Sequence, residues 1–186
     1  MKLNCWHCIL VIGILSCNDP DKASATNDTN KFADSSHHQT SISATIISTG
    51  KTKPAELIAF AKSLIGTPYH YGSSIPQQGL DCSGFVTYVF THFGITVPRS
   101  SVDFTNVQRE IDIKDAQPGD LILFTGTDST IRTVGHMGII VSNVNNDIAF
   151  IHSTSGKAYG VTETILKPHY LGRYVKTIRI FPQNNQ

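Results

Sequence analysis

Residues 79–94 read GLDCSGFVTYVFTHFG, and this stretch decides the expected fold. Apolar residues recur at helical spacing from Phe85 onward, and Gly94 follows as a natural stop. Asp81 stands at the expected N-cap, where its carboxylate can accept a hydrogen bond from an amide of the first turn. Cys82 is therefore expected to open a buried helix.

A second helix and a group of strands are expected around this helix. Residues 54–65 place their apolar side chains on one helical face, and Gly66 suits the end of that helix. From residue 117 onward the chain consists of short β-rich runs: PGDLILF, GHMGIIVS, DIAFIHS, YGVTETIL and RYVKTIRIF. Helices followed by strands predict an α+β fold, with N-terminal helices packed on an antiparallel sheet of about five strands.

Length and charge limit the classes of protein that need considering. The chain has 186 residues, 40% of them hydrophobic, which is enough for one domain with a real core. Its 15 basic and 14 acidic residues are balanced, and no basic stripe appears. No nucleic acid partner is expected, and we expect a monomer.

The first residues have the layout of an export signal. An apolar run over residues 9–15 is too short to span a bilayer but has the length of a signal-peptide core. Ser16 before Cys17 resembles the lipobox of bacterial lipoproteins. Residues 1–16 are therefore predicted to be a lipoprotein signal peptide, and Cys17 to carry a lipid that anchors the chain to a membrane. An ordinary secretory signal cut near the same place is the alternative.

The segment after Cys17 is predicted to be a tether. Residues 17–50 are rich in Ser, Thr, Asn and Asp, which predicts a flexible polar linker carrying the lipid at its start. The adjacent His37 and His38 in this linker are not expected to bind a metal. The folded domain is predicted over residues 51–186, in the bacterial cell envelope, at the outer membrane or the periplasmic face.

The cysteine count singles out one thiol. Cys5 and Cys8 are predicted to leave with the signal, and Cys17 to be lipidated. Cys82 then remains as the free thiol of a protein exported to an oxidising compartment. Such a thiol is either deeply buried or used in chemistry.

The position of Cys82 suits a nucleophile. Backbone amides at a helix N-terminus favour a thiolate and can also stabilise an oxyanion. The neighbouring Asp81 carboxylate opposes the thiolate, so a histidine partner is needed to set the balance.

Two histidines on expected strands could serve this thiol. His136 lies between glycines, and His152 ends a strand before a polar turn. His136 would act as the base and His152 would orient it. The plainer alternative is a core thiol with two structural histidines, and the remaining domain histidines are placed in that structural category: His70, His92 and His169.

Six motifs in fixed order carry a resemblance to a known family: GTPYHYG, GLDCSGFV, VPRSS, QPGDLILF, GHMGIIV and FIHSTSG. From about Pro54 to Phe181 the chain resembles the NlpC-type cell-wall cysteine peptidases of the papain-like superfamily. The resemblance implies a papain-like fold and hydrolysis of the peptide stems of bacterial peptidoglycan. It also implies that no metal or other cofactor takes part.

The resemblance also assigns roles to single residues. It makes Cys82 the nucleophile, His136 the general base and His152 the third member of a Cys-His-His triad. It implies that the hydroxyl of Tyr69 helps the Cys82 amide to hold the oxyanion. Flanking the nucleophile, two residues are expected to line the substrate groove: Asp81 and Ser83.

One loop departs from the family pattern. Ser73 stands where the family has the second glycine of its YGG motif, and the loop 74–79 carries an extra residue. This departure predicts a changed shape of the substrate groove, with the triad intact.

Several functions remain open from the sequence. The leading hypothesis is a lipid-anchored endopeptidase that cuts either the bond from D-glutamate to the diamino acid or the D-alanine cross-link. The alternatives are a non-catalytic cell-wall binding module, an amidase that separates sugar from peptide, and a zinc site. The zinc site would use Cys82, His136 and His152 as ligands.

Overall fold

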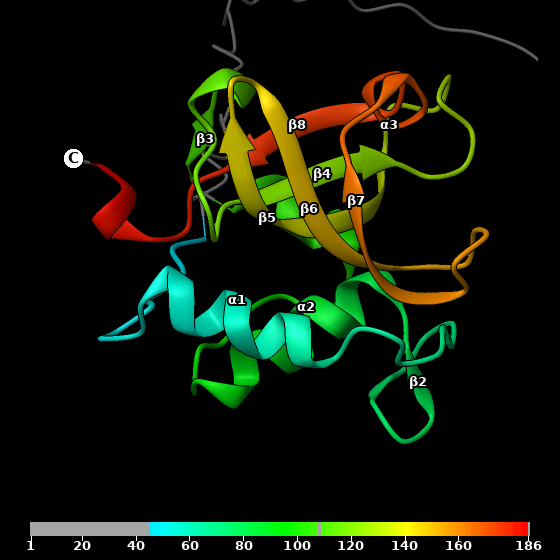
Figure 1. The fold of residues 1–186 in the computed structure, drawn as a ribbon, viewed down its shortest axis with the longest axis horizontal. Helices are drawn as coiled ribbons and strands as arrows, with labels where there is room; N and C mark the ends of the chain where they lie inside the picture. The colour runs from blue at the N-terminus through cyan, green and yellow to red at the C-terminus, as the bar shows by residue number, and fades with distance from the viewer. Residues whose placement is uncertain (1–44, 108, 186) are drawn as a thin grey trace, which may run out of the picture. The chain divides into compact units, whose positions relative to one another are not determined.

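The computed structural model describes residues 45–107 and 109–185 (Figure 1). The predicted signal peptide, Cys17 and residues 18–44 of the predicted tether lie outside the described residues. The elements are α1 (Pro54–Ser63), β1 (Ser74–Ile75), β2 (Gly79–Leu80), α2 (Cys82–His92), η1 (Ser101–Asn106), β3 (Glu110–Ile111), η2 (Ile113–Asp115), β4 (Leu121–Thr125), β5 (Val134–Val144), β6 (Asp147–Thr154), β7 (Gly160–Ile165), α3 (Pro168–Leu171), β8 (Tyr174–Ile178) and η3 (Pro182–Asn185).

A six-stranded sheet forms the larger layer, with the strand order β3-β8-β4-β5-β6-β7 and antiparallel pairing throughout. The five predicted strands correspond to β4 to β8, which confirms the α+β class. The sixth strand, β3, was not predicted, because its two residues are too few to show alternation. Strands β1 and β2 form a separate small hairpin.

The two faces of the sheet bury different side chains. Leu121 and Leu123 of β4 join the main core, which also contains the apolar residues of α1 and α2. Ile122 and Phe124 alternate with them and belong to a second cluster with residues of β5 and β6. Figure 1 shows α1 and α2 together on one side of the sheet. This is the layered arrangement that an α+β domain needs to bury an apolar face.

Helix α2 forms as its sequence predicts. The Asp81 carboxylate accepts a hydrogen bond from the Gly84 amide, so the predicted N-cap is confirmed. The apolar residues Phe85, Val89 and Phe90 are fully buried. Burial of this helix against the sheet fixes the position of its first residue.

The domain begins earlier than the predicted boundary at Lys51. Ile47 is only 6% exposed and packs into the main core, and the Thr45 amide donates to the Asn106 carbonyl at 3.0 Å. Residues 45–50 therefore belong to the folded domain, because a buried isoleucine ties the end of the predicted tether to it.

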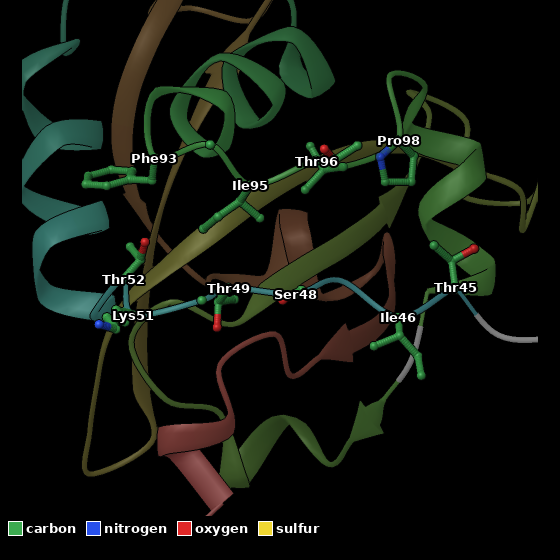
Figure 2. Close-up of a pocket in the computed structure, with 13 residues that line it drawn as sticks. Thr45, Ile46, Ser48, Thr49, Lys51, Thr52, Phe93, Ile95, Thr96 and Pro98 are labelled. Carbon is green, nitrogen blue, oxygen red and sulfur yellow. The ribbon is translucent and has the colours of Figure 1, made fainter.

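An open groove with a volume of about 690 Å³ lies between residues 45–52 and residues 93–98. Figure 2 shows the residues that line it. No candidate site residue lines it. In the described part of the chain, no helix combines the length and the apolar character needed to cross a membrane.

Candidate active site

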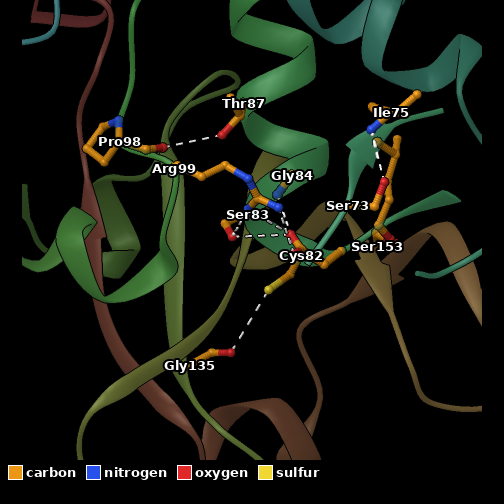
Figure 3. A network of polar contacts seen from close by, with 12 residues as sticks. Ser73, Ile75, Cys82, Ser83, Gly84, Thr87, Pro98, Arg99, Gly135 and Ser153 are labelled. Atoms are coloured by element: carbon orange, nitrogen blue, oxygen red, sulfur yellow. Dashed lines mark hydrogen bonds and ion pairs between the residues drawn. The ribbon is translucent and has the colours of Figure 1, made fainter. Parts of the chain in front are cut away.

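The thiol lies where α2 meets the beginning of β5. Cys82 is 9% exposed, and its Sγ lies 4.0 Å from the carbonyl oxygen of Gly135 (Figure 3). It lines a cavity of about 530 Å³ together with Tyr69, Asp81 and Ser83. The structure thus brings four of the predicted site residues to one cavity.

The two candidate histidines form a hydrogen-bonded pair on neighbouring strands. Nε2 of His136 on β5 lies 2.8 Å from Nδ1 of His152 on β6. Nε2 of His152 lies 3.0 Å from the hydroxyl of Thr164 on β7. If His152 donates to Thr164, its Nδ1 accepts from His136, and Nδ1 of His136 keeps its lone pair. The chain of contacts therefore supports a base at Nδ1 of His136.

A β-bulge lies directly before His136, at the residue that the thiol contacts. Thr125 pairs with Val134 but Phe124 pairs with His136, so Gly135 is the extra residue. Bulges commonly re-aim side chains next to active sites. Among the described residues, Cys82 and the His136 ring form no hydrogen bond; the sulfur contacts the carbonyl just before that histidine.

Aromatic rings enclose the histidine pair. The Tyr170 ring lies 6.1 Å from the His136 ring and 5.4 Å from the His152 ring, centroid to centroid. The guanidinium of Arg173 lies 5.5 Å from the centre of the Tyr170 ring.

Burial lowers the pKa of His136 well below its usual value, and the charges of His152 and Arg173 add to the effect. Burial and Arg173 also lower the pKa of His152 to about 4, so both rings are neutral near pH 7.

We predict that this pair makes stability fall in acid. Between pH 6.5 and about 4 the folded protein binds fewer protons at His152 than the unfolded chain, so lower pH favours unfolding. Urea unfolding at stepped pH should show a steeper loss for the wild type than for His152→Gln. The difference in slope is expected to reach about 1.4 kcal/mol per pH unit. Parallel slopes for the two proteins would refute the assignment.

Arg99 holds the turn in front of the nucleophile. Its Nη2 lies 3.0 Å from Oδ2 of Asp81, and its Nη1 lies 3.2 Å from Oδ1. The same Nη1 donates to the Ser83 hydroxyl at 3.0 Å (Figure 3). A planar guanidinium can bind a carboxylate through two bonds at once. Sequence reasoning missed this role, although Arg99 lies in the VPRSS motif.

Burial outweighs the effect of the helix N-terminus on the thiol. Burial and, to a smaller extent, the Asp81 carboxylate together raise the pKa of Cys82 to about 11. Amides of Cys82, Ser83 and Met137 lower the pKa, but they do not outweigh burial. The thiol is therefore protonated near pH 7, and it needs a base in order to react.

The contribution of Asp81 to this pKa can be tested by alkylation. Asp81→Asn removes a negative charge that raises the pKa of Cys82, so this pKa should fall. The rate of reaction with iodoacetamide at pH 8 should rise about threefold to tenfold. A rate equal to the wild type or lower would show that Asp81 does not destabilise the thiolate. Asp103→Asn, on the exposed side of η1, is the matched control.

The loop that departs from the family pattern follows directly on two residues that line this cavity, Tyr71 and Gly72. Ser73 is buried, and its hydroxyl accepts from the Ile75 amide at 3.1 Å. Residues 73–79 are absent from the lining of the Cys82 cavity, because β1 and β2 fold this segment into its own hairpin. The changed shape of the substrate groove at this loop stays a prediction.

The remaining histidines and the zinc hypothesis can be placed as well. Nδ1 of His70 lies 3.0 Å from the Gln78 carbonyl, and the His92 ring stacks on Phe60 at 3.6 Å. His169 is exposed.

Within residues 45–107 and 109–185, no group of three or more His, Cys, Asp or Glu side chains is placed to hold a metal ion. The structure thus offers no support for a zinc site.

The fold and site together define a class. A buried thiol at a helix N-terminus, in contact with the strand that carries one of two hydrogen-bonded histidines, combines the residue types that cysteine hydrolases use. The family model described as "NlpC/P60 family" matches residues 66–179, which is more than half of the chain. The chain belongs to the NlpC/P60 family.

Individual relatives agree with this family. The probable endopeptidase NlpC of Escherichia coli is 32% identical over 68% of this chain and 78% of its own length. The gamma-DL-glutamyl hydrolase of Bacillus subtilis is 29% identical over 72% of this chain and 32% of its own. The structure of the peptidoglycan hydrolase RipB from Mycobacterium tuberculosis has a TM-score of 0.53 and 27% identity, over 68% of this chain and 64% of that one. The chain thus spans only about a third of the Bacillus subtilis relative.

Proposed function

We propose that this protein is a cell-wall cysteine endopeptidase that hydrolyses amide bonds in peptidoglycan stem peptides or cross-links. The observation that carries the proposal is the buried thiol of Cys82 in contact with the Gly135 carbonyl, directly before His136, whose Nε2 is held by His152. The relatives support the substrate class, because their names describe endopeptidases and a peptidoglycan hydrolase.

The proposed reaction begins with proton transfer. His136 takes the thiol proton at Nδ1, and Sγ attacks the carbonyl carbon of the scissile amide. This requires Sγ to leave the Gly135 carbonyl and meet the ring when substrate binds, as catalytic hydrogen bonds often tighten only in the complex. His152 accepts from Nε2 of His136 and so stabilises the imidazolium.

The second half of the reaction restores the enzyme. The tetrahedral intermediate collapses as His136 returns its proton to the leaving amine, and a thioester remains on Cys82. His136 then takes a proton from water, the resulting hydroxide attacks the thioester carbonyl, and Cys82 leaves and is reprotonated. The products are one new carboxylate and one new amine.

Tyr69 is proposed to stabilise the oxyanion with the Cys82 amide. Burial raises the pKa of Tyr69, and the charges of Cys82 and Asp81 raise it further. The phenol therefore keeps its proton at neutral pH and can donate it to a developing negative oxygen. Asp81 and Ser83, held by Arg99, are proposed to line the groove next to this position.

Product analysis tests this function. Purified muropeptides are incubated with the domain and with Cys82→Ala, and the products are identified by mass spectrometry. An endopeptidase yields muropeptides with shortened or separated peptides, and the alanine variant yields none. Release of intact stems from sugar would instead establish the amidase, and uncut muropeptides with retained sacculus binding would establish a binding module.

We also propose that Cys17 carries a lipid that anchors the protein in the bacterial cell envelope. The support is the sequence alone: a short apolar run followed by Ser16 and Cys17. Metabolic labelling with a radioactive fatty acid should mark the wild type and not Cys17→Ala. A labelled alanine variant would rule this anchor out.

A further inference from the structure

The histidine pair continues into a third polar group on β7. Nε2 of His152 lies 3.0 Å from the hydroxyl oxygen of Thr164, and Nδ1 of the same ring lies 2.8 Å from Nε2 of His136. The three side chains come from three neighbouring strands, in the order β5-β6-β7. They therefore form one chain of hydrogen bonds that runs across the sheet and ends at Thr164.

Two arrangements of hydrogen atoms are possible in this chain. Both rings are neutral near pH 7, so each carries one hydrogen. In the first arrangement, His152 donates from Nε2 to Thr164, and His136 donates from Nε2 to His152, which leaves the lone pair on Nδ1 of His136. In the second arrangement, Thr164 donates to Nε2 of His152, and both rings carry their hydrogen on Nδ1. Only the first arrangement leaves His136 able to take a proton at Nδ1.

The surroundings of Thr164 favour the first arrangement. The Thr164 side chain is half-buried and lines a cavity of about 590 Å³, so its own hydrogen can be donated to solvent while its oxygen accepts from the ring. His152 is fully buried, and an unpaired ring N–H there would be costly. In the described part of the chain, Thr164 supplies the hydrogen-bond partner of Nε2 of His152.

We propose that Thr164 is a positioning residue that keeps His152, and through it His136, in the tautomer with the lone pair on Nδ1 of His136. Thr164 does not line the Cys82 cavity, so it acts through the two rings. When His136 takes a proton, neither hydrogen bond of the chain has to reverse, because Nε2 of His136 remains the donor to His152. The consequence for catalysis rests on the proposed function, whereas the tautomer itself is a property of the resting protein.

The neighbouring Thr162 provides a matched control. It pairs with His152 in the register of β6 and β7, lies on the same face of β7 as Thr164, and lines the same cavity. Its hydroxyl donates to the Glu163 carbonyl at 3.4 Å and not to an imidazole. Thr162→Val and Thr164→Val thus replace the same hydroxyl by a methyl group on the same face, and only the second removes a bond to the histidine pair.

NMR spectroscopy of the protein labelled with 15N in its histidines tests the proposal at neutral pH without substrate, because a protonated ring nitrogen differs in chemical shift from an unprotonated one. The signals of His152 are assigned from their loss in His152→Gln. The wild type and Thr162→Val should carry the hydrogen on Nε2 of both rings. In Thr164→Val a population with the hydrogen on Nδ1 of His152 should appear, and kcat for muropeptide hydrolysis should fall about threefold to tenfold with KM nearly unchanged. Thr164→Ser should restore both the tautomer and kcat.

The outcomes separate this inference from the function beneath it. A hydrogen on Nδ1 of His152 in the wild type would overturn the proposal, and so would identical tautomers in Thr164→Val and the wild type. Equal losses of kcat in Thr162→Val and Thr164→Val would overturn it as well. If the wild type leaves muropeptides uncut but the tautomers respond to Thr164→Val as expected, the endopeptidase function fails and the role of Thr164 stands.

Discussion

Replacement of His136 by alanine is expected to lower kcat/KM for muropeptide hydrolysis by about 10³-fold or more. The thiol has a pKa near 11, so without a base almost none of it is ionised near pH 7. The loss should be smaller at pH 10, because hydroxide then supplies part of the thiolate. This pH dependence distinguishes a lost base from a damaged fold, and kinetic assays from pH 6 to pH 10 measure it.

Two further histidine variants sharpen this test. His152→Leu leaves Nε2 of His136 without an acceptor and should cost about 10²-fold, whereas His152→Asn offers an amide oxygen and should retain more activity. His70→Ala is the matched control, since the His70 ring bonds to the Gln78 carbonyl and lines neither the Cys82 cavity nor the histidine pair. An active His136→Ala, or equal losses in His136→Ala and His70→Ala, would disprove the assignment of the base.

Replacement of Gly84 by alanine is expected to destabilise the domain by about 3 kcal/mol or more. A Cβ at this position would lie 2.0 Å from the Ser73 carbonyl oxygen and 2.9 Å from Oδ1 of Asp81. Neither neighbour can easily move: the Ser73 carbonyl accepts from the Asp81 amide at 3.0 Å, and Asp81 is bound to Arg99. The clash would therefore distort the turn that directly precedes Cys82.

Urea unfolding measures this effect against a matched glycine. At Gly126 an added Cβ would meet no atom within 4 Å, so Gly126→Ala should change stability by less than about 1 kcal/mol. Equal unfolding midpoints and slopes for the two variants would show that α2 does not pack against residue 73 as described.

Periodicity accounts for the part of the fold that could be predicted. The recurrence of apolar residues identified α1, α2 and the strands β4 to β8, and Asp81 identified the start of α2. Strand β3 is too short for any pattern. Ile47 stands in a polar segment, and its burial depends on core residues that come later in the sequence. Its burial could therefore not be predicted from its neighbours.

The site shows the same division between local and distant information. Motifs named Tyr69, Cys82 and the two histidines, and the structure places the first two in one cavity and bonds the histidines to each other. The contacts that residues of distant segments make with the site could not be predicted, because a local sequence pattern does not show which segments will pack against it. These residues are Arg99, Thr164, Tyr170 and Arg173. The direction of the shift in the pKa of Cys82 was left open by the sequence, since it depends on burial.

Trapping the acyl-enzyme tests the central claim most directly. The protein is mixed with a defined muropeptide, quenched in acid within milliseconds to seconds, digested, and mapped by mass spectrometry. The account predicts that, during turnover, the peptide containing Cys82 gains the mass of the acyl part of the substrate. This acyl part is the substrate without its leaving amine. Continued turnover in Cys82→Ala, with no acyl group on the Cys82 peptide of the wild type, would contradict it.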